Sequence, residues 1–134
     1  MQTIDKTDIN VRTIVIADDH AIVRQGVSLV LSGIPNTKIV SEAENGLLAI
    51  SAVKRLTPDM LVVDAAMPLA KGIEVLAECR RWSPDTHVML LTGFTAASIL
   101  SQWINAGVDG ILLKSSPPED MKTGFEIVLS GGRY

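Results

Sequence analysis

The stretch Ile14–Gly26 reads IVIADDHAIVRQG and holds one complete unit of the predicted fold. Its apolar start has the length and β-branched content of a buried strand, and the residues after the acidic pair have the spacing of a helix. Asp18 and Asp19 stand between the two. Adjacent carboxylates repel each other, so this placement adds nothing to stability by itself. The stretch therefore predicts a buried strand that ends at two carboxylates in a functional site.

The same alternation of a strand-length apolar run and a helical segment continues to the end of the chain. It predicts an α/β fold, a doubly wound parallel sheet with crossover helices on both faces. We expect the last helix to start with Ser116 as its cap and Pro117 at its first position, followed by Glu119. The predicted strands are Thr13–Ala17, Lys38–Ala43, Met60–Asp64, His87–Thr92 and Val108–Leu113.

The composition is that of one globular domain. Its 134 residues are 47% hydrophobic, enough to bury a single core without disulfides, and a net charge of −3 offers no basic surface for nucleic acid. The only cysteine, Cys79, is interpreted as an ordinary helix residue in a reducing compartment. The sequence has neither a membrane-length apolar run nor a secretory signal, so we expect a cytoplasmic protein without a membrane partner.

Polar residues stand at the carboxyl ends of four of the predicted strands. An open parallel sheet forms its binding crevice at these ends. These residues are Asp18, Asp19, Asp64, Thr92 and Lys114. Clustered carboxylates need a cation, and hard oxygen ligands without a Cys or His set favour Mg²⁺ over zinc. A carboxylate that shares such a site with a lysine can act as a nucleophile toward a phosphoryl group.

The motifs around these residues resemble the receiver domains of two-component response regulators, particularly the NarL/FixJ type with a LuxR-type output. They are IADDH, VVDAAMP, LLTG and GVDGILLK, and both DDHAIVRQG and the terminal GGRY are especially similar to the NarL/FixJ type. The resemblance covers nearly the whole chain. It implies a flavodoxin-like (βα)5 fold with strand order 2-1-3-4-5.

The resemblance also implies a role for each acidic residue. Asp64 would accept a phosphoryl group from the phosphohistidine of a sensor histidine kinase. The Mg²⁺ cofactor would be bound directly by Asp19, mainly through water by Asp18, and also by Asp64 and the backbone carbonyl of Ala66. The chain would then be a phosphoacceptor rather than an enzyme.

Lys114 and Thr92 would bind phosphoryl oxygens once Asp64 is phosphorylated. Their movement would change the outer surface of the fourth helix, fifth strand and fifth helix, with a homodimer as one outcome of phosphorylation. The receiver domain would span residues 12–130 after a flexible arm of residues 1–11. Residues 131–134 would start a linker to a helix-turn-helix output domain outside this chain, through which alone the protein would bind DNA and control transcription.

Three positions differ from the usual family pattern. Ile111 stands where a Tyr or Phe usually moves between two rotamers, so the aromatic part of the switch has no ring here. Gly93 follows Thr92 where alanine is most common, which leaves the loop more flexible. Ser115 follows Lys114 where proline is common, and a cis bond before a non-proline residue would cost about 3–4 kcal/mol.

Simpler interpretations stay open for single residues. The acidic pair could cap a helix, His20 could be an ordinary early-helix residue near the site, and Trp103 could belong either to the core or to an interface. Two other functions also stay open. The Ile111 difference keeps a phosphate-independent interaction module as an alternative to the phosphorylated receiver. A Mg²⁺-dependent aspartyl-phosphate phosphatase would need a second acid where this chain has Ala66.

Overall fold

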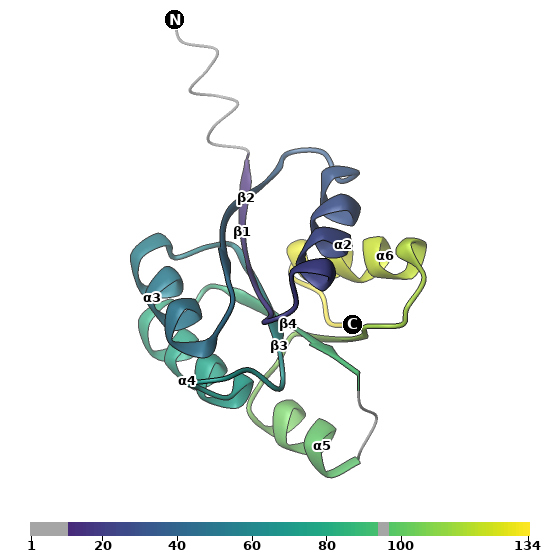
Figure 1. Ribbon diagram of the computed structural model, residues 1–134. Helices are drawn as coiled ribbons and strands as arrows, with labels where there is room; N and C mark the ends of the chain where they lie inside the picture. The colour runs from purple at the N-terminus through teal and green to yellow at the C-terminus, as the bar shows by residue number, and fades with distance from the viewer. Residues whose placement is uncertain (1–10, 94–96) are drawn as a thin grey trace, which may run out of the picture.

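A five-stranded parallel sheet forms the centre of the computed structural model, which describes residues 11–93 and 97–134 (Figure 1). The strand order is β2-β1-β3-β4-β5, as the resemblance implied. Every neighbouring pair is parallel, so each connection crosses over through a helix. The strands are β1 (Arg12–Ala17), β2 (Thr37–Ala43), β3 (Met60–Asp64), β4 (His87–Thr92) and β5 (Gly110–Leu113).

Helices cover both faces of this sheet (Figure 1). Two of them, α2 (Ala21–Ser32) and α6 (Pro118–Leu129), pack on one face, and the other three pack on the opposite face. Those three are α3 (Gly46–Leu56), α4 (Gly72–Trp82) and α5 (Ala97–Asn105). The predicted doubly wound architecture is therefore confirmed.

Side chains that alternate along each strand divide the core into two layers. In β1, Ile14 and Ile16 point toward α2 and α6, whereas Val15 and Ala17 point toward the other three helices. All five residues of β3 are buried because this central strand is covered on both faces. Trp103 belongs to the core, in the layer beneath α3, α4 and α5. A central strand without exposed positions places its last residue, an aspartate, at the bottom of any crevice formed there.

The predicted strand limits agree with the structure to within one residue, apart from β5. This strand starts at Gly110, two residues later than predicted. The amide of Val108 donates a hydrogen bond to the carbonyl of Trp103 instead and closes the end of α5. The predicted Ser116 cap is wrong: α6 begins at Pro118 with Pro117 as N-cap residue, and the Ser116 amide donates to the Leu113 carbonyl in a tight turn.

The last four residues, whose role as the start of a linker stays a prediction, lie against the domain. Gly132 and Tyr134 donate their amides to the carbonyls of Ile127 and Asp109, at 2.9 and 3.0 Å. The ring of Tyr134 packs on α6 where Gly124 has no side chain. The chain's end is thus fixed beside the first residues of β5. Of the predicted N-terminal arm, residues 1–10 lie outside the described residues.

Within residues 11–93 and 97–134, none of the helices has both the length and the hydropathy that a membrane crossing requires.

Candidate functional site

Four strands of the sheet bring the predicted polar residues together at its carboxyl edge. Asp18 follows β1, Asp64 and Thr92 are the last residues of β3 and β4, and Lys114 follows β5. Asp18, Asp64 and Thr92 are buried. The ammonium nitrogen of Lys114 lies 3.0 Å from Oδ2 of Asp18 and 3.1 Å from Oδ2 of Asp64. One lysine thus pairs with two buried carboxylates.

Backbone hydrogen bonds extend the sheet into the site and position these side chains. The Asp18 amide donates to the carbonyl of Ala43 at 3.0 Å, and the Lys114 amide donates to the carbonyl of Thr92 at 2.8 Å. On Asp64, Oδ1 accepts from the amide of Ala66 at 3.3 Å, so Oδ2 faces the lysine. The carbonyl of Ala66 as a metal ligand stays a prediction.

Burial and charge change the pKa of both partners in this pair. Burial raises the pKa of Asp64 above its ordinary value, although the amide of Ala66 and the ammonium of Lys114 both oppose that rise. For Lys114, burial lowers the pKa, but the carboxylates of Asp18 and Asp64 outweigh it, and the pKa ends above the usual lysine value. The lysine is therefore charged, and Asp64 is held in an environment that disfavours its negative charge.

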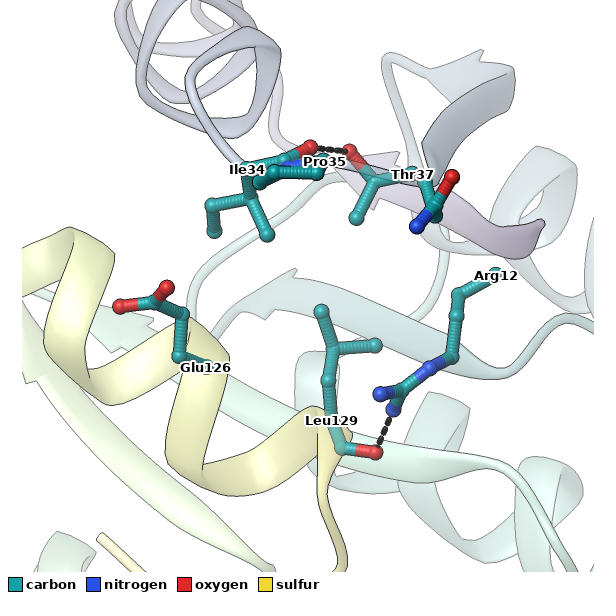
Figure 2. A pocket seen from close by; sticks show the side chains of 7 residues that line it. Arg12, Ile34, Pro35, Thr37, Glu126 and Leu129 are labelled. Atoms are coloured by element: carbon teal, nitrogen blue, oxygen red, sulfur yellow. Dashed lines mark hydrogen bonds between the residues drawn. The ribbon is translucent and has the colours of Figure 1, made fainter. Parts of the chain in front are cut away.

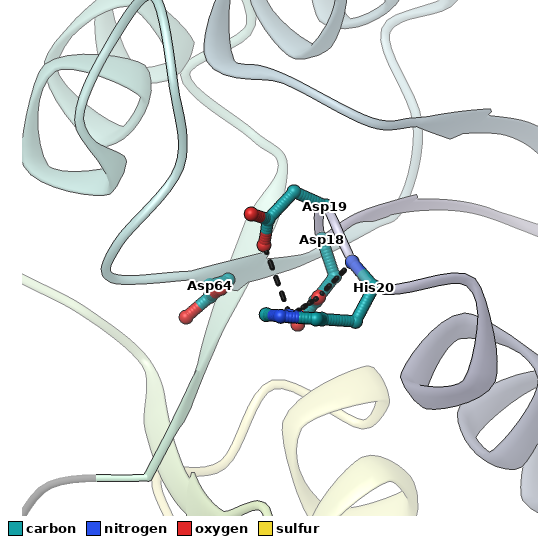
Figure 3. Close-up of side chains that lie close together, drawn as sticks. All are labelled: Asp18, Asp19, His20 and Asp64. Carbon is teal, nitrogen blue, oxygen red and sulfur yellow. Dashed lines mark hydrogen bonds and ion pairs between the residues drawn. The ribbon is translucent and has the colours of Figure 1, made fainter.

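A metal-binding arrangement follows from the acidic cluster shown in Figure 3. Asp18, Asp19, His20 and Asp64 each offer one ligand atom, and these atoms all lie within 4.8 Å of one another. Oδ2 of Asp18 is buried and accepts no well-aligned hydrogen bond from the described residues, despite the nearby ammonium. Three carboxylates against one lysine leave two negative charges uncompensated. These residues therefore fit a divalent cation with oxygen ligands.

Two glycines allow the loop after β3 to fold closely around the site. A Cβ atom on Gly72 would lie 2.3 Å from the carbonyl oxygen of Asp64, and one on Gly46 would lie 2.0 Å from that of Ala70. In the same loop Leu69 is exposed and has a φ of +73°. The loop that holds Asp64 thus depends on close backbone approaches that a single sequence does not reveal.

Arg24 of α2 supports the acidic pair, a role that the sequence alone did not indicate. Its guanidinium donates to the carbonyl of Asp18 at 2.6 Å and to a carboxylate oxygen of Glu42 at 3.1 Å. The available signal was an arginine one turn into the helix that follows the two aspartates. His20, for which the sequence offers the interpretation of an ordinary early-helix residue, contacts both of its acidic neighbours.

The three residues that differ from the family pattern lie in β5 or in the loops that follow β4 and β5. Ile111 is partly buried against the core cluster that includes Trp103 and Leu90. Gly93 is exposed, and residues 94–96 of its loop lie outside the described residues. No peptide bond in the described ranges is cis, so Lys114 and Ser115 are joined by a trans bond.

A hollow of about 280 Å³ lies at the opposite edge of the sheet, where β1 and β2 begin (Figure 2). The guanidinium of Arg12 donates to the carbonyl of Leu129 there, and the Thr37 hydroxyl donates to the carbonyl of Ile34 at 2.8 Å. The first bond joins the start of β1 to the end of α6, and the second closes the turn between α2 and β2. Glu126 is the one acidic residue in its lining. The hollow therefore has the features of a structural junction rather than of a second metal or phosphate site.

Comparison with known proteins gives one family over most of the chain. Residues 14–126 match the response regulator receiver domain. The oxygen regulatory protein NreC of Staphylococcus epidermidis is 34% identical over 122 residues, which are 90% of this chain and 56% of that protein. The chain thus spans about half the length of the curated relatives that it matches.

Solved structures agree with this family. The isolated REC domain of RcsB from Salmonella enterica serovar Typhimurium, solved with the phosphomimetic BeF3⁻, has a TM-score of 0.86 at 28% identity and covers 93% of both chains. A two-component response regulator of the LuxR family from Aurantimonas sp. SI85-9A1 has a TM-score of 0.85 at 29% identity and covers 92% of this chain and 88% of that one.

Proposed function

This chain belongs to the response regulator receiver domain family, among regulators of the NarL/LuxR type, and on that basis we propose that Asp64 is its phosphoacceptor residue. The carboxylate oxygen of Asp64 forms a bond to phosphorus while the bond between phosphorus and the imidazole nitrogen of a kinase phosphohistidine breaks. The leaving imidazole takes up a proton. The observation that carries this proposal is the Lys114 ammonium shared by two buried carboxylates, at 3.0 and 3.1 Å.

The surroundings of Asp64 favour this residue over its neighbours as the nucleophile. It ends the central buried strand, and its Oδ1 is oriented by the amide of Ala66. Burial is the largest cause of its raised pKa, so the negative charge of Asp64 is unfavourable there. Formation of a bond to an electrophile relieves part of that charge. Asp18 and Asp19, with Asp64 and the Ala66 carbonyl, would hold Mg²⁺. When bound, that ion would offset negative charge on the phosphoryl oxygens.

Lys114 and Thr92 couple the site to the output surface in this proposal. A phosphoryl group on Asp64 adds negative charge beside an ammonium that two carboxylates already share. The carbonyl of Thr92 accepts from the amide of Lys114, so a movement of either residue is transmitted to the end of the neighbouring strand. The surface formed by α5, β5 and α6 would change as a result, and Ile104 and Leu113 are exposed on it.

The proposed partners follow from the same chemistry. A sensor histidine kinase supplies the phosphoryl group, and a second copy of the chain can pair with the altered surface. Because the chain spans about half of its curated relatives, we include an output domain outside this chain, of helix-turn-helix type, that acts on transcription. The reading frame beyond Tyr134 tests that part directly.

Intact-mass measurement tests the phosphoacceptor role. After incubation with Mg²⁺ and acetyl phosphate, the protein should gain the mass of one phosphoryl group. Asp64→Ala should gain none, while Asp85→Ala, a change at an exposed loop residue, should behave as the unmodified protein does. The absence of an adduct, or an adduct that persists in Asp64→Ala, would refute the proposal.

A phosphate-independent interaction module is the second candidate, and Ile111 is the observation that favours it. Its aliphatic side chain packs against the cluster that contains Trp103, without a ring that could move between two positions. Titration with beryllofluoride and Mg²⁺ separates the two candidates. A change in tryptophan fluorescence or in oligomeric state supports the phosphorylated switch, whereas no change in either supports the module.

A further inference from the structure

We propose that Nδ1 of His20 is an additional ligand of the divalent cation, and that this nitrogen makes the site prefer a first-row transition ion such as Mn²⁺ over Mg²⁺. The inference rests on the cation site of the proposed function. It adds a neutral nitrogen donor to a set of oxygen ligands and so concerns which ion the site selects.

Distances within the acidic cluster support His20 as a metal ligand. Nδ1 of His20 lies 3.1 Å from Oδ1 of Asp19 and 3.3 Å from Oδ1 of Asp18. An octahedral ion with ligand bonds of about 2.1 Å holds adjacent ligand atoms about 3.0 Å apart. Figure 3 shows the ring beside the carboxylates of Asp18 and Asp19, with Asp64 close by. The imidazole nitrogen is therefore spaced from each of the two carboxylate oxygens as a neighbouring ligand of one ion would be.

Backbone hydrogen bonds place His20 beside the acidic pair, where its side chain is 63% exposed. His20 is the N-cap residue of α2, and its carbonyl accepts from the amides of Val23 and Arg24 at 3.1 and 3.2 Å. Its own amide donates to Oδ1 of Asp18 at 2.8 Å. The side chain makes no capping hydrogen bond to the helix. The ring is consequently available to the acidic cluster instead of the helix end.

The charges within the cluster also support His20 as a ligand. Asp18, Asp19 and Asp64 carry three negative charges, and Lys114 supplies one positive charge. A divalent ion offsets the two remaining negative charges, and an imidazole nitrogen can act as a ligand without adding charge. The competing interpretation is a ring that contacts both carboxylates without binding an ion. In that case the ring would leave when the ion binds.

The chemistry of the donor decides the selectivity. Oxygen ligands suit both Mg²⁺ and Mn²⁺, whereas an imidazole ligand favours first-row transition ions, among which Mn²⁺ is the weakest binder. Nitrogen ligation would therefore strengthen Mn²⁺ binding while changing Mg²⁺ binding little. Even outer partners of a metal ligand are worth about 10- to 100-fold in affinity, so removal of the ligand itself should cost at least about tenfold for Mn²⁺.

Electron paramagnetic resonance of the Mn²⁺-loaded protein tests the assignment. Pulsed measurements should detect nitrogen coupling in the unmodified protein, and incorporation of ¹⁵N-labelled histidine should change its frequency. His20→Ala and His20→Gln should both lose the coupling. The chain has two histidines, so His87→Ala is the matched control: His87 starts β4 at the far edge of the sheet, and its variant should keep the signal.

Competition titrations give the second readout. The ratio of the Mg²⁺ to the Mn²⁺ dissociation constant should fall about tenfold in His20→Ala and stay constant in His87→Ala. The assignment is overturned if the unmodified protein shows no nitrogen coupling. It is also overturned if His20→Ala leaves the ratio of the two dissociation constants unchanged. Acetyl phosphate labelling of the unmodified protein keeps the two proposals separate. Labelling without nitrogen coupling refutes only the His20 ligand, and coupling without labelling refutes only the phosphoacceptor role.

Discussion

Asp64→Asn should stabilise the metal-free protein by about 1–2 kcal/mol, because the charge of Asp64 is unfavourable where it lies. The attraction to Lys114 across 3.1 Å is worth about 5 kcal/mol at an effective dielectric constant of about 20. Asp18 and Asp19 lie within 4.8 Å, and each repels Asp64 by about 3 kcal/mol before water screens the more exposed Asp19. The Coulomb contributions nearly cancel.

Burial then decides whether the charge of Asp64 stabilises or destabilises the folded protein. An ion removed from water loses several kcal/mol of solvation, and burial is the largest cause of the raised pKa of Asp64. Asparagine keeps the shape of the side chain and an oxygen that can accept from Ala66. Its amide must also be desolvated, so only part of the cost is recovered. Lys114 keeps Asp18 as its partner at 3.0 Å.

Urea and thermal denaturation at pH 7 in EDTA, both followed by circular dichroism, measure the difference in the free energy of unfolding between the two proteins. A gain of 1 kcal/mol should raise the melting temperature by about 3–5 °C for a chain of this size. Asp85→Asn, in an exposed loop, should stay within about 0.5 kcal/mol of the unmodified protein. Added Mg²⁺ should stabilise the unmodified protein more than Asp64→Asn, because the variant has lost a ligand.

The pH dependence supplies a second check of the reasoning. The folded-state pKa of Asp64 is raised, so the stability that this carboxyl contributes is present below the ordinary aspartate value of 3.8 and is lost as the pH rises through the folded pKa. The advantage of Asp64→Asn should be largest at neutral pH and shrink as the pH falls toward 3.8. A variant that is less stable than the unmodified protein at pH 7 in EDTA, or an advantage that grows on acidification, would refute the reasoning.

Three further predictions concern the surroundings of the site. Leu69→Gly should raise the free energy of unfolding by about 1 kcal/mol because Leu69 is exposed at a φ of +73°, whereas Leu69→Ala, which keeps a Cβ, should gain much less in the same urea assay. Gly46→Ala should cost about 2–3 kcal/mol, since the new Cβ would lie 2.0 Å from the carbonyl oxygen of Ala70; a melting temperature within 2 °C of the unmodified protein, or about 0.5 kcal/mol, would contradict this. Burial raises the pKa of Cys79 to about 11, so iodoacetamide at pH 8 should alkylate the urea-unfolded protein but not the native one, and stability should fall as the pH rises from 9 to 11.

Strand limits were predictable where the side-chain pattern alone decides them. The runs Met60–Asp64 and His87–Thr92 are uninterrupted and lie in the centre of the sheet, and the structure has the same limits. The start of α6 was not predictable in this way. A Ser-Pro pair followed by a glutamate fits a helix start, but the Ser116 amide instead donates to Leu113 in a turn that only the path of β5 defines.

The site was predictable as far as topology decides it. Residues at the ends of parallel strands meet at one edge, so Asp18, Asp64 and Lys114 converge as expected. The contacts of Gly72 and Arg24 depend on loops and helices that approach from elsewhere in the chain. A single sequence gives no measure of such approaches, and these supporting residues became visible only in three dimensions.

Localisation of the phosphoryl group by peptide mass spectrometry is the most direct test of the central claim. Protein treated with Mg²⁺ and acetyl phosphate is reduced with borohydride, which converts an aspartyl phosphate to homoserine, and is then digested. We predict homoserine at position 64 alone, and none when acetyl phosphate is omitted. Homoserine at Asp18 or Asp19, or its absence from position 64 in protein that has gained the phosphoryl mass, would contradict the account.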